Sequence, residues 1–215
     1  MLQEWTVLGI DQSVNGTGFC VLKNARPALL ETLSMETYQG MDRLVAICDR
    51  VVALVGEHQP DIIVMEEPTG HVKSASIMQL VELFGCVKLQ IHRLGYPFGR
   101  EAILSPGKAF MQQNQSSMKK FMLGDGSMSK DSRYLLEIFE RIKVSFKDDN
   151  QADAYMHAWM VSIVRAVMRG NISIDTLPSY QQEALIARGV KHAKGLSMTK
   201  AMKLPPAEKA KLVGW

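Results

Sequence analysis

The sequence has few cysteines, no long apolar run and little net charge. Three cysteines occur in 215 residues, at positions 20, 48 and 86, with no Cys-x-x-Cys pair. This excludes a disulfide scaffold, argues against structural zinc and favours reduced thiols in a cytoplasmic compartment. No apolar run reaches the roughly 18 residues that a membrane span needs. The first residues lack the basic segment and apolar core of a signal peptide, so we expect a cytoplasmic protein.

The composition is that of a globular protein, with 47% hydrophobic and 22% charged residues. A chain of this length can bury a full core, in one domain or one domain plus an appendage. The net charge of +3 is concentrated near the C-terminus, where residues 171–215 carry seven lysines and arginines against three acids. We predict a main domain over residues 1–170 and a basic helical extension over 171–215. The extension either contacts a polyanion such as DNA or is simply solvated.

Apolar patterns predict alternating strands and helices. The expected strands are 6–10, 19–23, 28–35, 61–65 and 102–104, and the expected helices are 41–55, 74–94, 131–142 and 151–169. The polar, glycine-containing segment 114–130 is expected to be mostly loop. Three consecutive strands followed by alternating units predict an α/β fold. Its mixed sheet would have antiparallel first strands, parallel later strands and helices on its faces.

Acidic residues recur at the ends of these elements. Asp11 follows the first strand, Glu66 follows the fourth, and Asp149 and Asp153 share one face at the start of the last helix. If the two strands are neighbours, the carboxylates converge and require a cation between them. Oxygen ligands suit Mg²⁺ or Mn²⁺, and two such ions can support phosphodiester cleavage. Taken singly, each acid has an ordinary alternative as a turn residue, a loop charge or a helix cap.

Four segments resemble the motif blocks of a nuclease family. They are GIDQSVNGTGFCVL from residue 9, PDIIVME ending at residue 66, the stretch from Lys119 to GDGSMSK, and DDNQADAYMHA. In order and spacing they resemble RuvC-type Holliday junction resolvases, which are ribonuclease-H-like nucleases with many viral members. The resemblance covers about residues 6–165. It implies a ribonuclease-H-like mixed five-stranded sheet and suggests a viral or phage protein, which would work in the host cytoplasm.

The activity implied by this resemblance is that of a crossover junction endodeoxyribonuclease in DNA recombination and repair. Such an enzyme is a homodimer that resolves four-way junctions and other branched DNA by paired symmetric nicks, which leave 5′-phosphate and 3′-hydroxyl ends. It uses two Mg²⁺ ions per site, and Mn²⁺ can substitute. The long helix at 74–94 falls where the family forms its dimer interface.

The resemblance also implies site residues. The catalytic and metal-binding acids would be Asp11, Glu66, Asp149 and Asp153. The family's third acid falls on Asn150, so Asp149 is chosen, with Asp148 and Asn150 as alternatives. The DNA-binding lysines would be Lys119, Lys120, Lys130 and Lys108, where Lys108 competes with Lys119 for the first basic position and all four have the alternative of ordinary surface lysines. His157 is either an accessory ligand or base, or a packed residue. The family's aromatic wedge position is Thr69.

Other functions fit parts of the pattern. The first block also resembles that of actin-like sugar kinases and ATPases, but these are longer and need a second phosphate loop that is not found here. A ribonuclease-H-like nuclease acting on flaps, other branches or RNA–DNA hybrid shares the same acids. A non-catalytic module that binds branched DNA is disfavoured because buried acids without a metal ion are costly.

Overall fold

The structure is a computed structural model that describes residues 5–13, 15–67, 75–99, 102–103, 107–131, 133–193 and 196–213. Its sheet has the strand order β3-β2-β1-β4-β5. The strands are β1 (Thr6–Asp11), β2 (Gly16–Lys23), β3 (Arg26–Ser34), β4 (Ile62–Glu66) and β5 (Ala109–Gln113). β1 to β3 pair antiparallel, whereas β4 and β5 run parallel to β1. The predicted mixed five-stranded sheet is confirmed.

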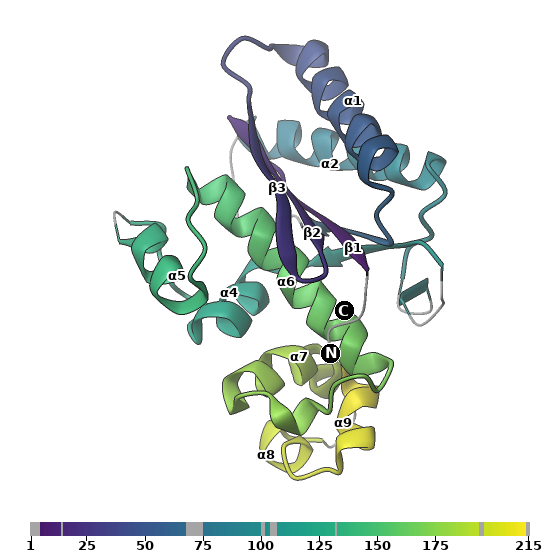
Figure 1. Ribbon diagram of the computed structural model, residues 1–215, viewed down its shortest axis with the longest axis vertical. Coiled ribbons are helices and arrows are strands. Elements are labelled where there is room, and N and C mark those ends of the chain that lie inside the picture. The colour runs from purple at the N-terminus through teal and green to yellow at the C-terminus, as the bar shows by residue number, and fades with distance from the viewer. Residues whose placement is uncertain are drawn as a thin grey trace.

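Helices cover both faces of this sheet (Figure 1). They are α1 (Gly40–His58), α2 (Ala75–Arg93), α4 (Gln115–Leu123), α5 (Tyr134–Ile142), α6 (Asp149–Met168), η1 (Ile174–Thr176), α7 (Ser179–His192), α8 (Met198–Ala201) and α9 (Pro206–Leu212). α1 and α2 lie over one face, and α6 crosses the other face with α4 and α5 beside it. None of the described helices is long and apolar enough to cross a membrane.

Alternate residues of the central strand β1 belong to two separate cores. Leu8 and Ile10 pack with α1 and α2, whereas Val7 packs on the side of α6. This alternation follows from the two-residue period of a strand that is buried on both faces. Because each face of the sheet has its own apolar cover, the strand is fixed in register.

Two glycines let α6 lie directly on the sheet. A Cβ atom at Gly9 in β1 would overlap the carbonyl oxygen of Ala154, and one at Gly18 in β2 would overlap that of Asn150. Both carbonyls belong to the first half of α6. The contact therefore holds the N-terminal half of α6 against the strands β1 and β2.

Two sequence-based predictions in the middle of the chain are wrong. Residues 102–103 are helical, and the fifth strand is β5, at Ala109–Gln113. The segment expected to be loop contains helix α4, because Asn114 caps it by accepting hydrogen bonds from the amides of Ser116 and Ser117. The buried face of α4 repeats at the three- and four-residue spacing of a helix, through Met118, Phe121 and Met122. Residues 104–106, Thr69 and His71 lie outside the described residues.

The C-terminal helices form a layer at the far end of α6, lowest in Figure 1. α7 packs on α4, and α9 packs on α7 and α6. A buried lysine fixes this layer, since the Nζ of Lys209 lies 2.6 Å from an oxygen of Asp175 and 3.2 Å from that of Gln182. An ion pair of 2.9 Å between Lys120 and Glu183 joins α4 to α7. The extension is therefore packed against the rest of the fold.

Candidate active site

The ends of two neighbouring strands bring two acids together. β1 and β4 are parallel neighbours, Ile10 pairs with Met65, and the next residues are Asp11 and Glu66. Both carboxyl groups therefore lie at the same edge of the sheet, as the sequence predicted for adjacent strands. The last residue of β5, Gln113, pairs with Glu66 and adds an amide to this edge.

Helix α6 supplies a histidine to the same edge. Ligand atoms of Asp11, Glu66 and His157 all lie within 4.8 Å of one another. The Nδ1 atom of His157 lies 2.9 Å from the Oε1 atom of Gln113. Since an amide oxygen can only accept, Nδ1 carries the proton and Nε2 keeps its lone pair. The buried Nε2 has no hydrogen-bond partner among the described residues, and a divalent cation is a partner that would satisfy it.

The protonation of these three groups suits a cation. Burial raises the pKa of Asp11 well above its ordinary value, and the carboxylate of Asp153 raises it further. Burial also raises the pKa of Glu66, although its hydrogen bond with Asp11 acts in the opposite direction. Burial lowers the pKa of His157 to about 4, so its ring is neutral at pH 7. Two carboxyl groups that share a proton can exchange that proton for a metal ion.

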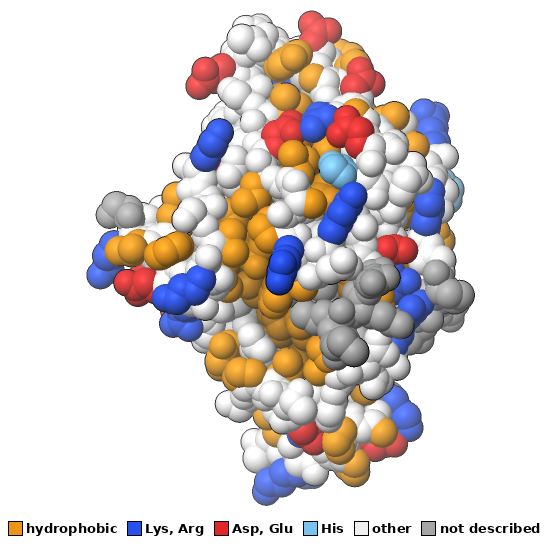
Figure 2. All heavy atoms as spheres, in the orientation of Figure 1, with side chains coloured by type: hydrophobic (Ala, Val, Ile, Leu, Met, Phe, Trp, Pro, Cys, Tyr) orange, Lys and Arg blue, Asp and Glu red, His pale blue; other side chains and the backbone are white. Residues whose placement is uncertain are grey.

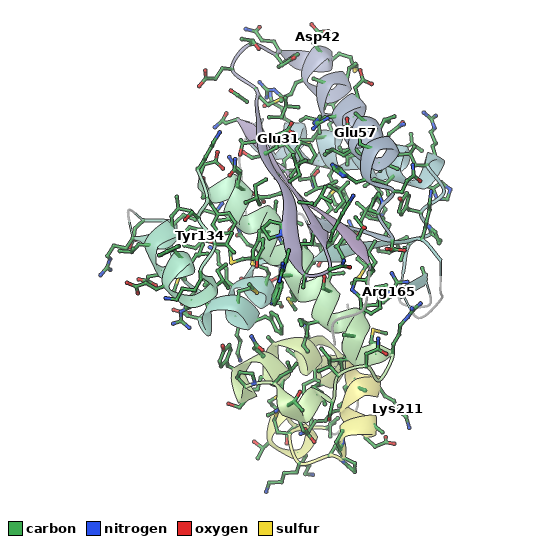
Figure 3. All side chains as sticks on the ribbon, in the orientation of Figure 1. Glu31, Asp42, Glu57, Tyr134, Arg165 and Lys211 are labelled. Carbon is green, nitrogen blue, oxygen red and sulfur yellow. The ribbon has the colours of Figure 1, made fainter. Side chains whose placement is uncertain are left out.

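Asp153, one of the two acids of α6, is held by three donors. Tyr134, labelled in Figure 3, donates its hydroxyl to one carboxylate oxygen from α5. The other oxygen lies 2.7 Å from the Nζ of Lys130 and 3.1 Å from the Nε2 of Gln115. Lys130 also pairs with Asp149 at 2.9 Å. Asp153 is fully buried, and both of its oxygens have partners within the protein.

The three candidates for the third acid have different surroundings. Asp148 caps α6, because its Oδ1 atom accepts from the amide of Gln151 at 2.9 Å and from the hydroxyl of Thr32 at 2.8 Å. The Nδ2 atom of Asn150 lies beside Gly16 of β2. Asp149 faces Lys130, which lowers its pKa although partial burial opposes this. Of the three candidates, Asp149 is the one that pairs with Lys130, which also pairs with Asp153.

The four predicted DNA-binding lysines lie in three places. Lys130 contacts the acids directly. Lys119 is buried in α4, donates to the carbonyl of Met128 at 2.8 Å and has its Nζ atom 5.2 Å from the centre of the Tyr134 ring. Lys120 is paired with Glu183. Lys108 lies over the ring of Tyr96 and precedes β5, so it is at the opposite edge of the sheet from Asp11 and Glu66.

Sequence reasoning missed the polar residues that organise these acids. Gln113 and Gln115 lie on either side of the cap of α4, in the region where the strand and the helix were misplaced. Tyr134 begins α5 and carries no acidic or basic signal. Only the four-residue spacing between Asp153 and His157 was visible in the sequence, since it places both side chains on one face of α6.

Two solved structures have the same architecture. A structure of Thermus thermophilus RuvC matches with a TM-score of 0.56 and 18% sequence identity, over 77% of this chain and 96% of that chain. T. thermophilus RuvC in complex with a Holliday junction substrate matches with a TM-score of 0.59 and 18% identity, over 78% of this chain and 96% of that chain. The chain has the RuvC fold.

At this level of identity the RuvC structures establish the fold alone. No protein-family model matches the sequence, and no curated protein matches it. The RuvC fold confirms the ribonuclease-H-like architecture that the four motif blocks implied. The roles of the individual acids and lysines remain predictions.

Proposed function

We propose that the protein is a metal-dependent endonuclease that resolves four-way and other branched DNA by paired nicks. The observation that carries the proposal is the convergence of Asp11, Glu66 and the unpartnered Nε2 of His157 at one sheet edge. The RuvC fold supports the choice of substrate, because one of the matching RuvC structures holds a Holliday junction.

The chemistry follows from the donor set. Asp11, Glu66 and His157 would hold a divalent cation, for which Mg²⁺ is our first choice and Mn²⁺ the second. When bound, the cation would stabilise negative charge on a phosphodiester and activate a water molecule for attack. The sequence prediction of two ions per site would add Asp149 and Asp153 as ligands. Cleavage would leave a 5′-phosphate and a 3′-hydroxyl.

Lys130 at the site and cationic side chains at the two ends of α5 would offer contacts for the DNA backbone. Lys130 lies among the acids, and Arg133 follows it with 74% of its side chain exposed. Arg141 and Lys143 are exposed at the end of α5, where Figure 2 shows lysine and arginine side chains gathered at the left of the molecule. These groups would position a phosphate backbone without reading its sequence. Lys108 and Lys120 have less support, because one is remote and the other is paired.

The proposed active unit is a homodimer that uses α2. The face of α2 that packs on the sheet includes the buried residues Leu83 and Val87. The opposite face carries the exposed apolar side chains of Met78, Val81 and Leu89. Exposed apolar side chains on one helix suit a self-complementary contact between two copies. Two identical sites related by a two-fold axis would cut a four-way junction symmetrically.

The proposal is tested with a labelled immobile junction and a linear duplex of matched sequence. We expect paired nicks in the junction with Mg²⁺, none with EDTA and little cutting of the duplex. Asp11→Asn should bind the junction as the wild type does and lower the cleavage rate at least ~100-fold, since it removes a carboxylate ligand of the proposed cation. Equal cutting of both substrates would indicate a less selective nuclease. Binding without cutting in Mg²⁺ or Mn²⁺ would contradict the proposal.

A further inference from the structure

The polar groups on the two sides of the acidic cluster, which comprises Asp11, Glu66, Asp149 and Asp153, differ in whether they have partners within the protein. On one side, His157 keeps an unpartnered nitrogen beside Asp11 and Glu66. On the other side, both oxygens of Asp153 have hydrogen-bond or ion-pair partners within the protein. The first side is organised for a cation from solution, whereas the second already has a positive partner from the chain.

That positive partner is the ammonium group of Lys130. Its Nζ atom lies 2.7 Å from an oxygen of Asp153 and 2.9 Å from an oxygen of Asp149. The ammonium group of Lys130 therefore forms an ion pair with each of two neighbouring carboxylates, one of which is fully buried. A charged group bridging two carboxylates occupies the place where a second divalent ion would bind to the same oxygens.

We infer that Lys130 serves as a built-in second cation, so that the DNA-free protein binds one divalent ion per chain, at Asp11, Glu66 and His157. The inference deepens the proposed function and rests on it in one respect, namely that the site binds a divalent ion. A second ion would need the oxygens of Asp149 and Asp153, and it would meet the charge of Lys130 at close range.

Removing the ammonium group of Lys130 should allow a second divalent ion to bind at Asp149 and Asp153. In Lys130→Met the side chain keeps a similar length but loses its charge. Asp149 and Asp153 then face each other and Asp11 with no positive partner from Lys130, which favours a divalent ion between them. Lys130→Arg keeps the charge and should keep the wild-type count. Lys147→Met is the matched control, because it removes an exposed lysine that precedes the cap of α6.

The test counts Mn²⁺ ions bound to the full-length, DNA-free protein, by electron paramagnetic resonance of the free ion during titration. We expect one ion per chain for the wild type, Lys130→Arg and Lys147→Met, and two for Lys130→Met. The bound ions should give an isolated-ion spectrum in the wild type and a spectrum broadened by a neighbouring ion in Lys130→Met. Circular dichroism establishes that each variant is folded.

The outcomes separate this inference from the proposed function. Two ions in the wild type would overturn the inference whatever the variants do, and would leave a two-metal nuclease. One ion in a folded Lys130→Met would also overturn it, because the lysine would then not be what excludes the second ion. No Mn²⁺ bound to any of the proteins would overturn both the inference and the proposed metal centre.

Discussion

At the scale of single residues, the site combines groups that are costly to bury. Asp11 is almost fully buried, and its raised pKa shows that the fold disfavours its charged form. The unfolded chain releases this proton near the ordinary pKa of an aspartate, whereas the folded protein retains it to a higher pH. In that interval the folded state binds more protons, so the free energy of unfolding contributed by Asp11 falls as the pH rises.

Asp11→Asn should therefore stabilise the metal-free protein at pH 7, although under the proposed function it would remove activity. We expect a gain of at least ~1 kcal/mol in the free energy of unfolding in EDTA, since each unit of pKa displacement corresponds to about 1.4 kcal/mol. The gain should shrink as the pH is lowered towards 4, where the unfolded Asp11 also holds its proton. Urea unfolding at several pH values measures it, and an unfolding free energy below that of the wild type at pH 7 would contradict the argument.

The acids of the site were predictable from the sequence, but their organisation was not. Asp11 and Glu66 end strands, and parallel neighbours must place such residues at one edge. The hydrogen bond that orients His157 is accepted by Gln113, at the end of a strand whose sequence, AFMQQ, is too short and too polar to give a clear pattern. The contrast between His157 and Asp153 depends on three-dimensional contacts, so no motif could reveal it.

At the scale of elements, the position of α6 depends on the absence of side chains beneath it. Gly9→Ala would place a methyl group against the carbonyl oxygen of Ala154. Because the clash is between the strand β1 and the backbone of α6, a change of side-chain rotamer cannot relieve it. We expect a loss of roughly 1–3 kcal/mol, typical of overpacking, together with reduced cleavage because Asp153 and His157 move away from Asp11. Urea unfolding and the junction assay measure the two effects.

A control for this substitution is available in α1. Gly56→Ala also adds one methyl group, but nothing lies within 4 Å of that position and the residue is helical. We expect it to stabilise the protein by about 0.5–1 kcal/mol, because alanine favours a helix interior over glycine. Equal behaviour of Gly9→Ala and Gly56→Ala would show that α6 does not rest closely on the sheet.

The elements that sequence reasoning placed correctly are those with strong periodicity. β1 and β4 are apolar runs, and α1 and α6 have long stretches with helical spacing. β5 and α4 were missed because each is short and is followed by polar residues that also suit a loop. The cap at Asn114 was a visible signal for α4, since an asparagine before a helical repeat of apolar residues marks a helix start.

At the scale of the whole molecule, the proposed dimer requires the exposed face of α2 to form the interface between the two copies. Val81→Glu places a charge on the exposed side of this helix, so it should convert a dimer to a monomer without unfolding the chain. The monomer should make single nicks rather than paired ones. Light scattering coupled to gel filtration measures the mass. Val45→Glu on α1, a position that is equally exposed at 49%, serves as the control and should remain dimeric.

Different lysines of the C-terminal extension are expected to contribute to DNA binding and to the stability of the fold. Lys200 and Lys203 are exposed, whereas Lys209 is buried against Asp175. Replacing Lys200 and Lys203 by alanine should weaken binding to junction and duplex alike. It should also make the slope of log binding constant against log salt concentration shallower, by an amount that corresponds to up to about two phosphate contacts.

Lys209→Ala should instead lower the free energy of unfolding by ~1–3 kcal/mol, because Gln182 and Asp175 lose their partner. Unchanged salt dependence in the double variant would indicate a purely structural extension.

The order of elements along the chain also matters while the protein is being made. Asp11 lies in the first strand, but α6, which carries Asp153 and His157, is the last element that covers the sheet. At ribosomal rates of about 5–20 residues per second, the growing chain exposes one apolar face of its sheet for on the order of ten seconds before α6 emerges. During that interval the nascent chain needs protection from aggregation. The proposed cation site also lacks His157 until α6 has been made.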